Sequence, residues 1–272
     1  MRHLSRSKAS AKGVPTFQWN VADRTVDPRA LLDVDHIVHL AGAGIADERW
    51  CKKRVRELIA SRADTSRLLL ERCVEAGVVP KSFVSAAGIG YYGAATTSRV
   101  FTEDDPTGAD TIARISAEWE KAVDEWTALC RAVKLRTPVV LSAEGGALPR
   151  MAAPFRWGLG AALGTGKQWM PWVHIDDLVR TYQLAIASEE MMGAYNVVGG
   201  NATNAEVTRA VGRAVKKPLW LPNVPGFVFR LTMGEMSSIL LGGSRVANER
   251  ITSTGFQFAH QDIGTTVNEL LA

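Results

Sequence analysis

The chain has 272 residues, with 32 Lys and Arg against 28 Asp and Glu, a net charge of +4 and a pI near 9.0. Its 46% hydrophobic and 22% charged residues exclude a disordered or fibrous protein. Cys51, Cys73 and Cys130 are odd in number and form no C-x-x-C pair, which argues against a disulfide framework or a thiolate metal site and favours a reducing, cytoplasmic setting.

Two classes of partner are not expected from the sequence. No apolar run reaches the roughly 18 residues of a membrane-spanning helix, so we expect a soluble protein with no membrane partner. Basic and acidic residues are interspersed along the chain, which favours a solvated surface over nucleic-acid binding. We expect a monomer or a homodimer that acts on a small molecule.

Short apolar runs alternate with helical patterns in the first half of the chain. The runs at 36–40, 82–84 and 133–141 are typical of buried parallel strands. Apolar residues at helical spacing predict a helix from about Arg54 to Ala76, which Gly77 ends. A polar loop over 94–110 precedes a second helix around Trp119 and Trp126. This alternation predicts an α/β fold with a parallel sheet and right-handed crossovers.

The C-terminal part follows a different pattern. Residues 193–272 combine a strand at 195–198 with helices at 205–215 and 263–271, so this tail is expected to form a small unit of its own. The predicted division is a first domain over 1–150 and a second over 151–272, with a helix at 178–190 that returns to the first domain.

The segments that follow the predicted strands are the most informative, because open parallel sheets bind ligands beyond the carboxyl ends of their strands. They read HLAGAGIA at 39–46, SAAGIGYYG at 85–93, LRT at 135–137, GGAL at 145–148, GTGKQ at 164–168, WVHIDDL at 172–178, GEM at 234–236 and GGSR at 242–245. In this order they resemble atypical extended short-chain dehydrogenase/reductases labelled "epimerase family protein", which end in a domain of unknown function. The resemblance implies a Rossmann-like doubly wound sheet that binds NADP over 1–150 and a smaller α/β substrate-binding and C-terminal domain over 151–272.

The same resemblance implies that a phosphate-binding turn is missing. In the family a strand, a G-x-T-G-x-x-G turn and a helix precede the position that matches Met1, and no other glycine run replaces them. There are two explanations: the chain is truncated, by a start assigned too late or by clipping, or it naturally lacks the motif. We favour truncation, because the loss of a central strand would expose the edges of the two strands beside it. Without the N–H groups of that turn, NADP binding is expected to be weak or absent.

The residues that remain indicate which cofactor would bind. Ser5 and Arg6, followed by Ser7 and Lys8, lie where NAD enzymes place an acidic residue, and a guanidinium suits the 2′-phosphate of NADP. The alternative is a polar, frayed terminus. The resemblance implies further cofactor contacts from Leu40, Ala41, Gly42, Glu57, Arg62, Ser85, Ala86, Pro138 and Val139. From their residue types alone, Glu57 and Arg62 would be solvated helix residues.

The usual catalytic pair of this superfamily is not found. A Tyr and a Lys one helical turn apart normally act as acid and base, but alignment on residues 119–120 places Ile112 and Ser116 there. The remaining candidates are Tyr91, Tyr92 and Ser85, although Tyr-Tyr-Gly is also a packing and turn element.

Two hypotheses for the function follow. One is an NADP(H)-dependent oxidoreductase or epimerase-like enzyme that acts on an unknown small, sugar-like substrate. The other is a catalytically inactive protein that binds a cofactor or acts as a regulatory partner. Some members of the family carry labels that connect them with cell division.

A substrate region is predicted between the two domains. Arg156, Trp169, Met170 and Trp172 are expected to shape the cleft, with core packing between the domains as the alternative. The G-T-G-K run at 164–167 departs from a phosphate-binding loop because Gln168 follows it.

One group of polar residues could be read as an acid/base or metal site. His174 precedes Asp176 and Asp177, and an imidazole near carboxylates is common in such sites. We expect instead that one of the carboxylates caps the helix that runs to Ala187 and that a backbone bond holds His174. No third His or Cys is near in the sequence, so no metal is expected.

Overall fold

The computed structural model describes residues 1–6 and 13–272. In this part of the chain a four-stranded parallel sheet has the order β10-β7-β5-β4. Its strands are β4 (His36–His39), β5 (Ser82–Gly88), β7 (Arg131–Thr137) and β10 (Gly193–Asn196). The parallel order confirms the predicted Rossmann-like α/β sheet.

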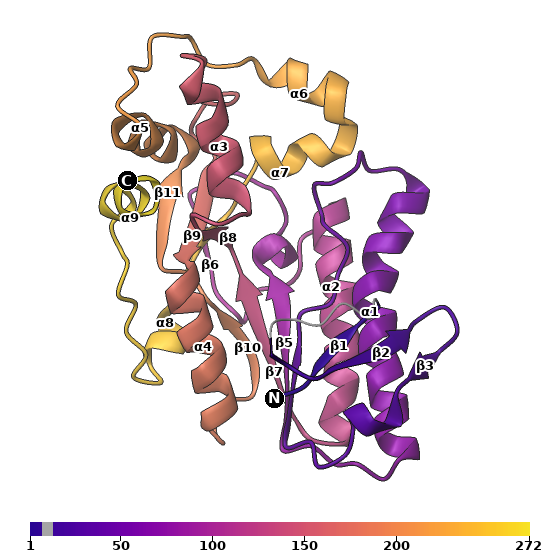
Figure 1. Ribbon diagram of the computed structural model, residues 1–272. Coiled ribbons are helices and arrows are strands. Elements are labelled where there is room, and N and C mark those ends of the chain that lie inside the picture. The colour runs from indigo at the N-terminus through magenta and orange to yellow at the C-terminus, as the bar shows by residue number, and fades with distance from the viewer. Residues whose placement is uncertain (7–12) are drawn as a thin grey trace.

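Helices cover both faces of this sheet (Figure 1). They are α1 (Lys52–Glu75), α2 (Thr111–Asp124) and α4 (Ile175–Ala187). Successive strand residues point to opposite faces, so Phe83 packs with the residues of α1 and α2, whereas Val84 packs with those of α4. Gly77, with φ +64°, lies just beyond the end of α1, as predicted.

The N-terminal strands form a separate three-stranded sheet in the described residues. Its members are β1 (His3–Ser5), β2 (Thr16–Asn20) and β3 (Thr25–Val26). Trp19 and Leu31 from this region share a core with Leu68 of α1. The small sheet therefore packs beside the central sheet, whose edge in the described part is β4.

A second sheet begins directly after β7. The strands β8 (Val139–Leu141), β9 (Trp169–His174) and β11 (Gly200–Thr203) form it. The prediction of one strand over 133–141 is wrong, because the chain passes from one sheet to the other at Pro138, which has no N–H to donate to a ladder.

The remaining elements build the C-terminal part. Its helices are α3 (Ala147–Arg156), α5 (Asn204–Ala214), α6 (Gly226–Met233), α7 (Ser238–Leu241), α8 (Glu249–Thr252) and α9 (Ile263–Leu271). The short strands β6 (Val100–Phe101) and β12 (Arg245–Val246) pair with each other. The expected strand at 195–198 does not belong to a separate C-terminal unit, because β10 pairs along β7 in the central sheet. No helix in the described residues is long and apolar enough to cross a membrane.

Candidate functional site

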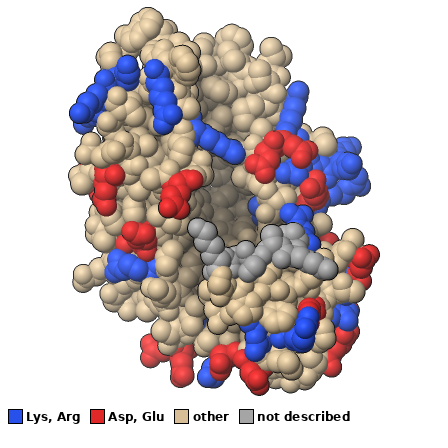
Figure 2. All heavy atoms as spheres, in the orientation of Figure 1, with Lys and Arg blue, Asp and Glu red and all other residues tan. Residues whose placement is uncertain are grey.

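A cavity of about 460 Å³ opens beyond the carboxyl ends of β4, β5 and β7. The space-filling view shows this side of the molecule hollowed between its two halves (Figure 2). The strand ends contribute Leu40, Ala86, Ala87, Gly88, Thr137 and Pro138, and α2 contributes Ile112, Ile115, Ser116 and Trp119. A crevice at this edge is where parallel α/β sheets bind their ligands. Its volume lies in the usual range for a small-molecule site.

Arg62 of α1 is a buried cation in the wall of this cavity. Its guanidinium donates hydrogen bonds to the carbonyls of Leu58 (3.0 Å) and Ala43 (2.9 Å) and lies 5.0 Å from the Trp119 ring centroid. Burial, with a further contribution from the charge of Arg54, lowers the pKa of Arg62. A positive charge fixed in this position can attract the phosphate or carboxylate of a ligand.

Gly42 allows the Arg62 side chain to approach the loop after β4. A Cβ at Gly42 would lie only 3.0 Å from the guanidinium carbon of Arg62. The resemblance implied Gly42 as a cofactor contact; in the structure its immediate effect is to make room for Arg62.

Ile112 and Ser116, the two positions that the sequence alignment matched to the usual catalytic Tyr and Lys, line the cavity. They lie one helical turn apart on α2, and the Ser116 hydroxyl donates to the carbonyl of Ile112 (3.0 Å). The cavity wall has an alkyl group and a hydroxyl where a phenol and an ammonium would act.

Four of the predicted cofactor residues line the cavity: Leu40, Arg62, Ala86 and Pro138. Four others have different surroundings. Ala41 packs partly buried beside the core of α1, Glu57 is exposed and pairs with Arg54 (2.9 Å), the Ser85 hydroxyl bonds within the sheet, and Val139 packs against the core of the second sheet.

Ser5 and Arg6 lie at and just beyond the end of β1 and are not among the residues that line the cavity. The carbonyl of Arg6 accepts a hydrogen bond from Gln18 (3.4 Å). Ser7 and Lys8, which complete the predicted 2′-phosphate cluster, lie outside the described residues.

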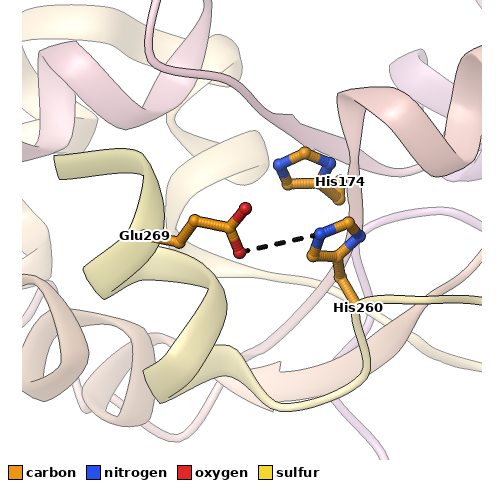
Figure 3. A group of neighbouring side chains, drawn as sticks. All are labelled: His174, His260 and Glu269. Atoms are coloured by element: carbon orange, nitrogen blue, oxygen red, sulfur yellow. Dashed lines mark ion pairs between the residues drawn. The ribbon is translucent and has the colours of Figure 1, made fainter. Parts of the chain in front are cut away.

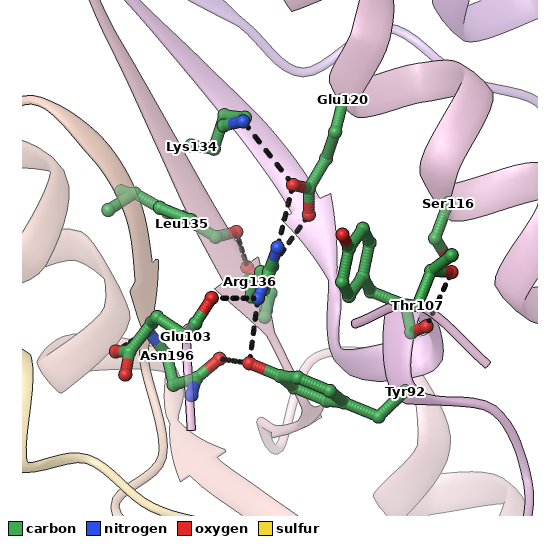
Figure 4. A network of polar contacts seen from close by, with 12 residues as sticks. Tyr92, Glu103, Thr107, Ser116, Glu120, Lys134, Leu135, Arg136 and Asn196 are labelled. Atoms are coloured by element: carbon green, nitrogen blue, oxygen red, sulfur yellow. Dashed lines mark hydrogen bonds and ion pairs between the residues drawn. The ribbon is translucent and has the colours of Figure 1, made fainter. Parts of the chain in front are cut away.

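A buried polar network beside the cavity contains Tyr92 (Figure 4). The Tyr92 hydroxyl donates to the Asn196 side chain (2.7 Å) and accepts from Arg136 (2.8 Å). Burial raises the pKa of Tyr92 to about 12. This corrects the placement expected for a catalytic phenol, because the Tyr92 hydroxyl holds two structural partners and does not line the cavity.

Arg136 is the centre of that network. It forms a two-point ion pair with Glu120 of α2, at 2.7 and 2.9 Å. Burial alone would lower the pKa of Arg136, but the hydrogen bonds and charge of Glu120 outweigh it and raise the pKa. Since Ser116 lies one turn before Glu120, this pair fixes the cavity-facing part of α2 against β7.

The other two catalytic candidates also have structural contacts. The Tyr91 ring lies 3.7 Å from the guanidinium carbon of Arg136. Ser85 is fully buried, and its hydroxyl donates to the carbonyl of Ala86 (2.8 Å) and lies 3.3 Å from Nδ1 of His39. Neither belongs to the cavity lining.

The residues predicted to shape a substrate cleft do not come together at the cavity. Trp172 is 1% exposed and, with Met170, packs in the core between α3, α5 and α9. Trp169 donates to the carbonyl of Thr97 (3.2 Å), and Arg156 is exposed at the end of α3.

His174 caps α4 in place of the predicted carboxylate. Its Nδ1 accepts the backbone N–H of Asp176 at 3.1 Å. The Asp177 carboxylate instead accepts hydrogen bonds from the backbone N–H groups of Ala259 and His260 and forms an ion pair with Arg180. Burial alone would raise the pKa of Asp177, but these N–H donors lower it. Asp177 thereby fastens the C-terminal segment to α4.

The C-terminal segment also brings His260 and Glu269 next to His174 (Figure 3). The two imidazoles stack with centroids 3.8 Å apart, and His260 Nε2 lies 3.7 Å from Glu269. The third potential ligand that the sequence lacked nearby thus comes from the end of the chain. Because Nδ1 of His174 accepts an N–H, its Nε2 carries the proton and suits a hydrogen-bond acceptor better than a metal ion.

Tyr182 and Thr137 are site residues that were not predicted from the sequence. Both line the cavity, and the Thr137 hydroxyl lies near the Tyr182 phenol. Burial raises the pKa of Tyr182 well above its ordinary value. The spacing of Ile175, Leu178 and Tyr182 on one face of α4 was the available signal, because i, i+3, i+7 residues share a helix face.

Comparison with known proteins places the chain in a family. The model of the NAD dependent epimerase/dehydratase family matches residues 2–198, and a domain of unknown function, DUF1731, matches 224–270. The chain belongs to the NAD dependent epimerase/dehydratase family. It is 39% identical over 269 residues to the epimerase family protein Mb2239 of Mycobacterium bovis, covering 97% of this chain and 86% of that protein.

Comparison with solved structures supports the same family. The human epimerase family protein SDR39U1, described with NADPH, has a TM-score of 0.86 and 30% identity, covering 99% of this chain and 90% of that one. A nucleoside-diphosphate sugar epimerase from Corynebacterium glutamicum has a TM-score of 0.73 and 25% identity, covering 95% of this chain and 53% of that one. The predicted family and fold are therefore confirmed.

Proposed function

We propose that this member of an NAD(P)-dependent family binds NADP(H) in the cavity at the carboxyl edge of the central sheet. The observation that carries the proposal is the position of the buried Arg62 cation in a cavity walled by small strand-end residues such as Ala86 and Gly88. Small residues let a flat ring approach the backbone, and the cation suits an anionic group of the cofactor. The NADPH described with the human relative supports the choice of cofactor.

Within the cavity we assign the protein groups as follows. Ala86, Pro138 and Ile112 form apolar walls beside the reactive ring, and Arg62 holds an anionic group. Arg6 and Ser5 would meet the 2′-phosphate. NADPH, when bound, supplies a hydride. Ser116, Thr137 and Tyr182 are the hydroxyls that line the space where a substrate oxygen would lie.

The reaction class we propose is an NADP(H)-dependent oxidoreductase or epimerase-like step on a small, sugar-like substrate. The description of the Corynebacterium glutamicum relative supports a sugar nucleotide as the first substrate to assay. A second candidate is a cofactor-binding protein without turnover, which Ile112 and Ser116 in place of the usual acid/base pair favour. The two candidates differ in whether bound NADPH is consumed when nucleoside-diphosphate sugars and their keto forms are added.

The proposal is tested by titration of NADPH and NADH followed by nicotinamide fluorescence. We expect the chain to bind NADPH weakly, in line with the expectation from the sequence, but more tightly than NADH, and Arg6→Ala to reduce that difference. Leu40→Glu adds a negative charge at the cavity, so it should weaken NADPH binding at least about tenfold. Leu32→Glu is the matched control, because Leu32 is similarly exposed (57% against 65%) but does not line the cavity. No NADPH binding, or equal effects of the two Glu variants, would contradict the proposal.

A further inference from the structure

Charge is unevenly distributed in the folded chain. The segments 145–168 and 207–234 together contain eight Lys and Arg residues and no Asp or Glu, which leaves 24 basic and 28 acidic residues elsewhere. These segments include α3, α6 and all of α5 after its first turn, which carries Glu206; the three helices lie at one end of the molecule, uppermost in Figure 1. The upper left of Figure 2 accordingly shows basic side chains without acidic ones. We name residues 145–168 and 207–234 the basic end.

Contacts join the parts of the basic end into one surface. Leu163 forms a β-bridge with Val224, and a Cβ at Gly212 of α5 would lie 3.2 Å from the Phe155 ring of α3. Between α5 and the following loop a groove of about 330 Å³ is lined by Arg209, Arg213, Lys216, Lys217 and Leu219, among other residues. Four cations in one groove produce a positive potential that attracts anions.

Large apolar side chains of the basic end are also exposed. Trp157 and Trp220 are 83% and 68% exposed, and Phe227 and Leu231, one turn apart on α6, are 65% and 77% exposed. Met233, near the end of the same helix, packs inward. Helix α6 therefore directs an apolar face outward, where a solvated helix would place polar residues.

We propose that the basic end binds the surface of an anionic phospholipid membrane. Its cations would meet the headgroups, while Trp157, Trp220, Phe227 and Leu231 enter the interface, where aromatic and apolar side chains are stable. The apolar groups protrude from a helix and loops instead of lining a groove, which suits a deformable bilayer better than a folded partner. Nucleic acid would use the cations but not Phe227 and Leu231.

This inference changes one expectation from the sequence. The prediction of no membrane partner considered a spanning helix and the average interspersion of charges. Binding at a membrane surface needs no spanning helix, and the fold brings together two distant segments that each lack acidic residues.

Sedimentation with lipid vesicles tests the proposal. We expect binding to vesicles of phosphatidylcholine with about one third phosphatidylglycerol, no binding to phosphatidylcholine alone, and weaker binding as salt is raised. The double variant Lys216→Glu with Lys217→Glu should bind at least about tenfold more weakly. Its matched control is Lys52→Glu with Lys53→Glu, another exposed adjacent pair, at the start of α1, which should bind like the unmodified chain.

A second variant distinguishes binding to lipid from binding to a partner that is held by charge alone. Phe227→Ser with Leu231→Ser should also weaken vesicle binding, because it removes the groups that enter the interface. The proposal is overturned if anionic vesicles do not bind, or if the Lys216 and Lys217 pair and the Lys52 and Lys53 pair behave alike. It is also overturned if the Ser variant binds normally while duplex DNA competes with the vesicles. Circular dichroism on each variant shows that the fold is retained.

Discussion

The cavity side and the basic end of this molecule use charge in opposite ways. Beside the cavity, Arg136 and Glu120 are 3% exposed and form a two-point pair. At the basic end, Lys216 and Lys217 are exposed, and no acidic residue lies in the same segments. Charge inside the first region fixes one element against another, whereas charge on the second is available to a partner.

The apolar side chains of the two regions also differ, in that several large ones at the basic end are exposed. Those around the central sheet are buried, such as Phe83 and Val84 at 0% exposure, but α6 has no buried residue. Buried groups contribute to stability in proportion to the area they remove from water, and exposed ones do not. Stability should therefore respond to changes near the cavity and hardly at all to changes of the exposed side chains of the basic end.

The largest effect is expected for Arg136→Met. It leaves the Glu120 carboxylate buried without its two-point partner, with only Lys134 at 3.5 Å. Removing one partner of a buried pair costs about 3–5 kcal/mol, which urea unfolding would measure. Arg213→Met at the basic end is the matched control and should change the unfolding free energy by less than about 0.5 kcal/mol. A loss below about 1 kcal/mol for Arg136→Met would mean that Lys134 compensates.

The next effect concerns His39, which is buried between Ser85 and Thr65. Burial, with a smaller contribution from Arg62, lowers its pKa to about 4. The unfolded chain takes up this proton at about pH 6.5 and the folded chain only at about pH 4, so stability falls as pH decreases through that window, by about 3 kcal/mol at most.

The control for this prediction is His39→Gln, which cannot titrate. Urea unfolding at about pH 7 and about pH 5 should show a smaller difference for this variant than for the unmodified chain, whereas the exposed His3→Gln should keep the full difference. An unchanged difference in His39→Gln would assign the pH dependence to other groups.

A smaller effect distinguishes the neighbouring tyrosines. Tyr92→Phe removes the hydroxyl between Arg136 and Asn196 and should cost about 1–3 kcal/mol in urea unfolding. Tyr91→Phe keeps the ring over Arg136 and should cost less than about 0.5 kcal/mol. If Tyr92→Phe instead retained full stability and lost turnover on an identified substrate, Tyr92 would be the acid/base residue predicted from the sequence.

The fold was predictable where one local pattern determined it. Helical spacing and Gly77 located α1 to within a few residues, and the strand–helix alternation predicted the parallel sheet. The change of sheet at Pro138 and the return of β10 to β7 depend on contacts between distant segments, which periodicity does not contain. Leu40, Arg62, Ala86 and Pro138, which the resemblance implies as cofactor contacts, line the cavity.

The rest of the site depends on partners far along the chain. Tyr92 is withdrawn from the cavity by Asn196, and Asp177 is directed away from its expected capping role by residues 259–260. The basic end was hidden for the same reason, since its two segments are separated by almost 40 residues in the sequence.

The smallest effect on stability is expected for Phe227→Ser with Leu231→Ser. Both side chains are already in water, so the free energy of unfolding should change by less than about 0.5 kcal/mol. Urea unfolding measures this directly, and Phe83→Ser in the sheet core should cost several kcal/mol for comparison. A large loss in the α6 variant would mean that this face is covered in solution by another copy of the chain, and the loss should then depend on protein concentration. With stability unchanged, any weakening of vesicle binding by this variant reports the loss of interfacial contact and not unfolding.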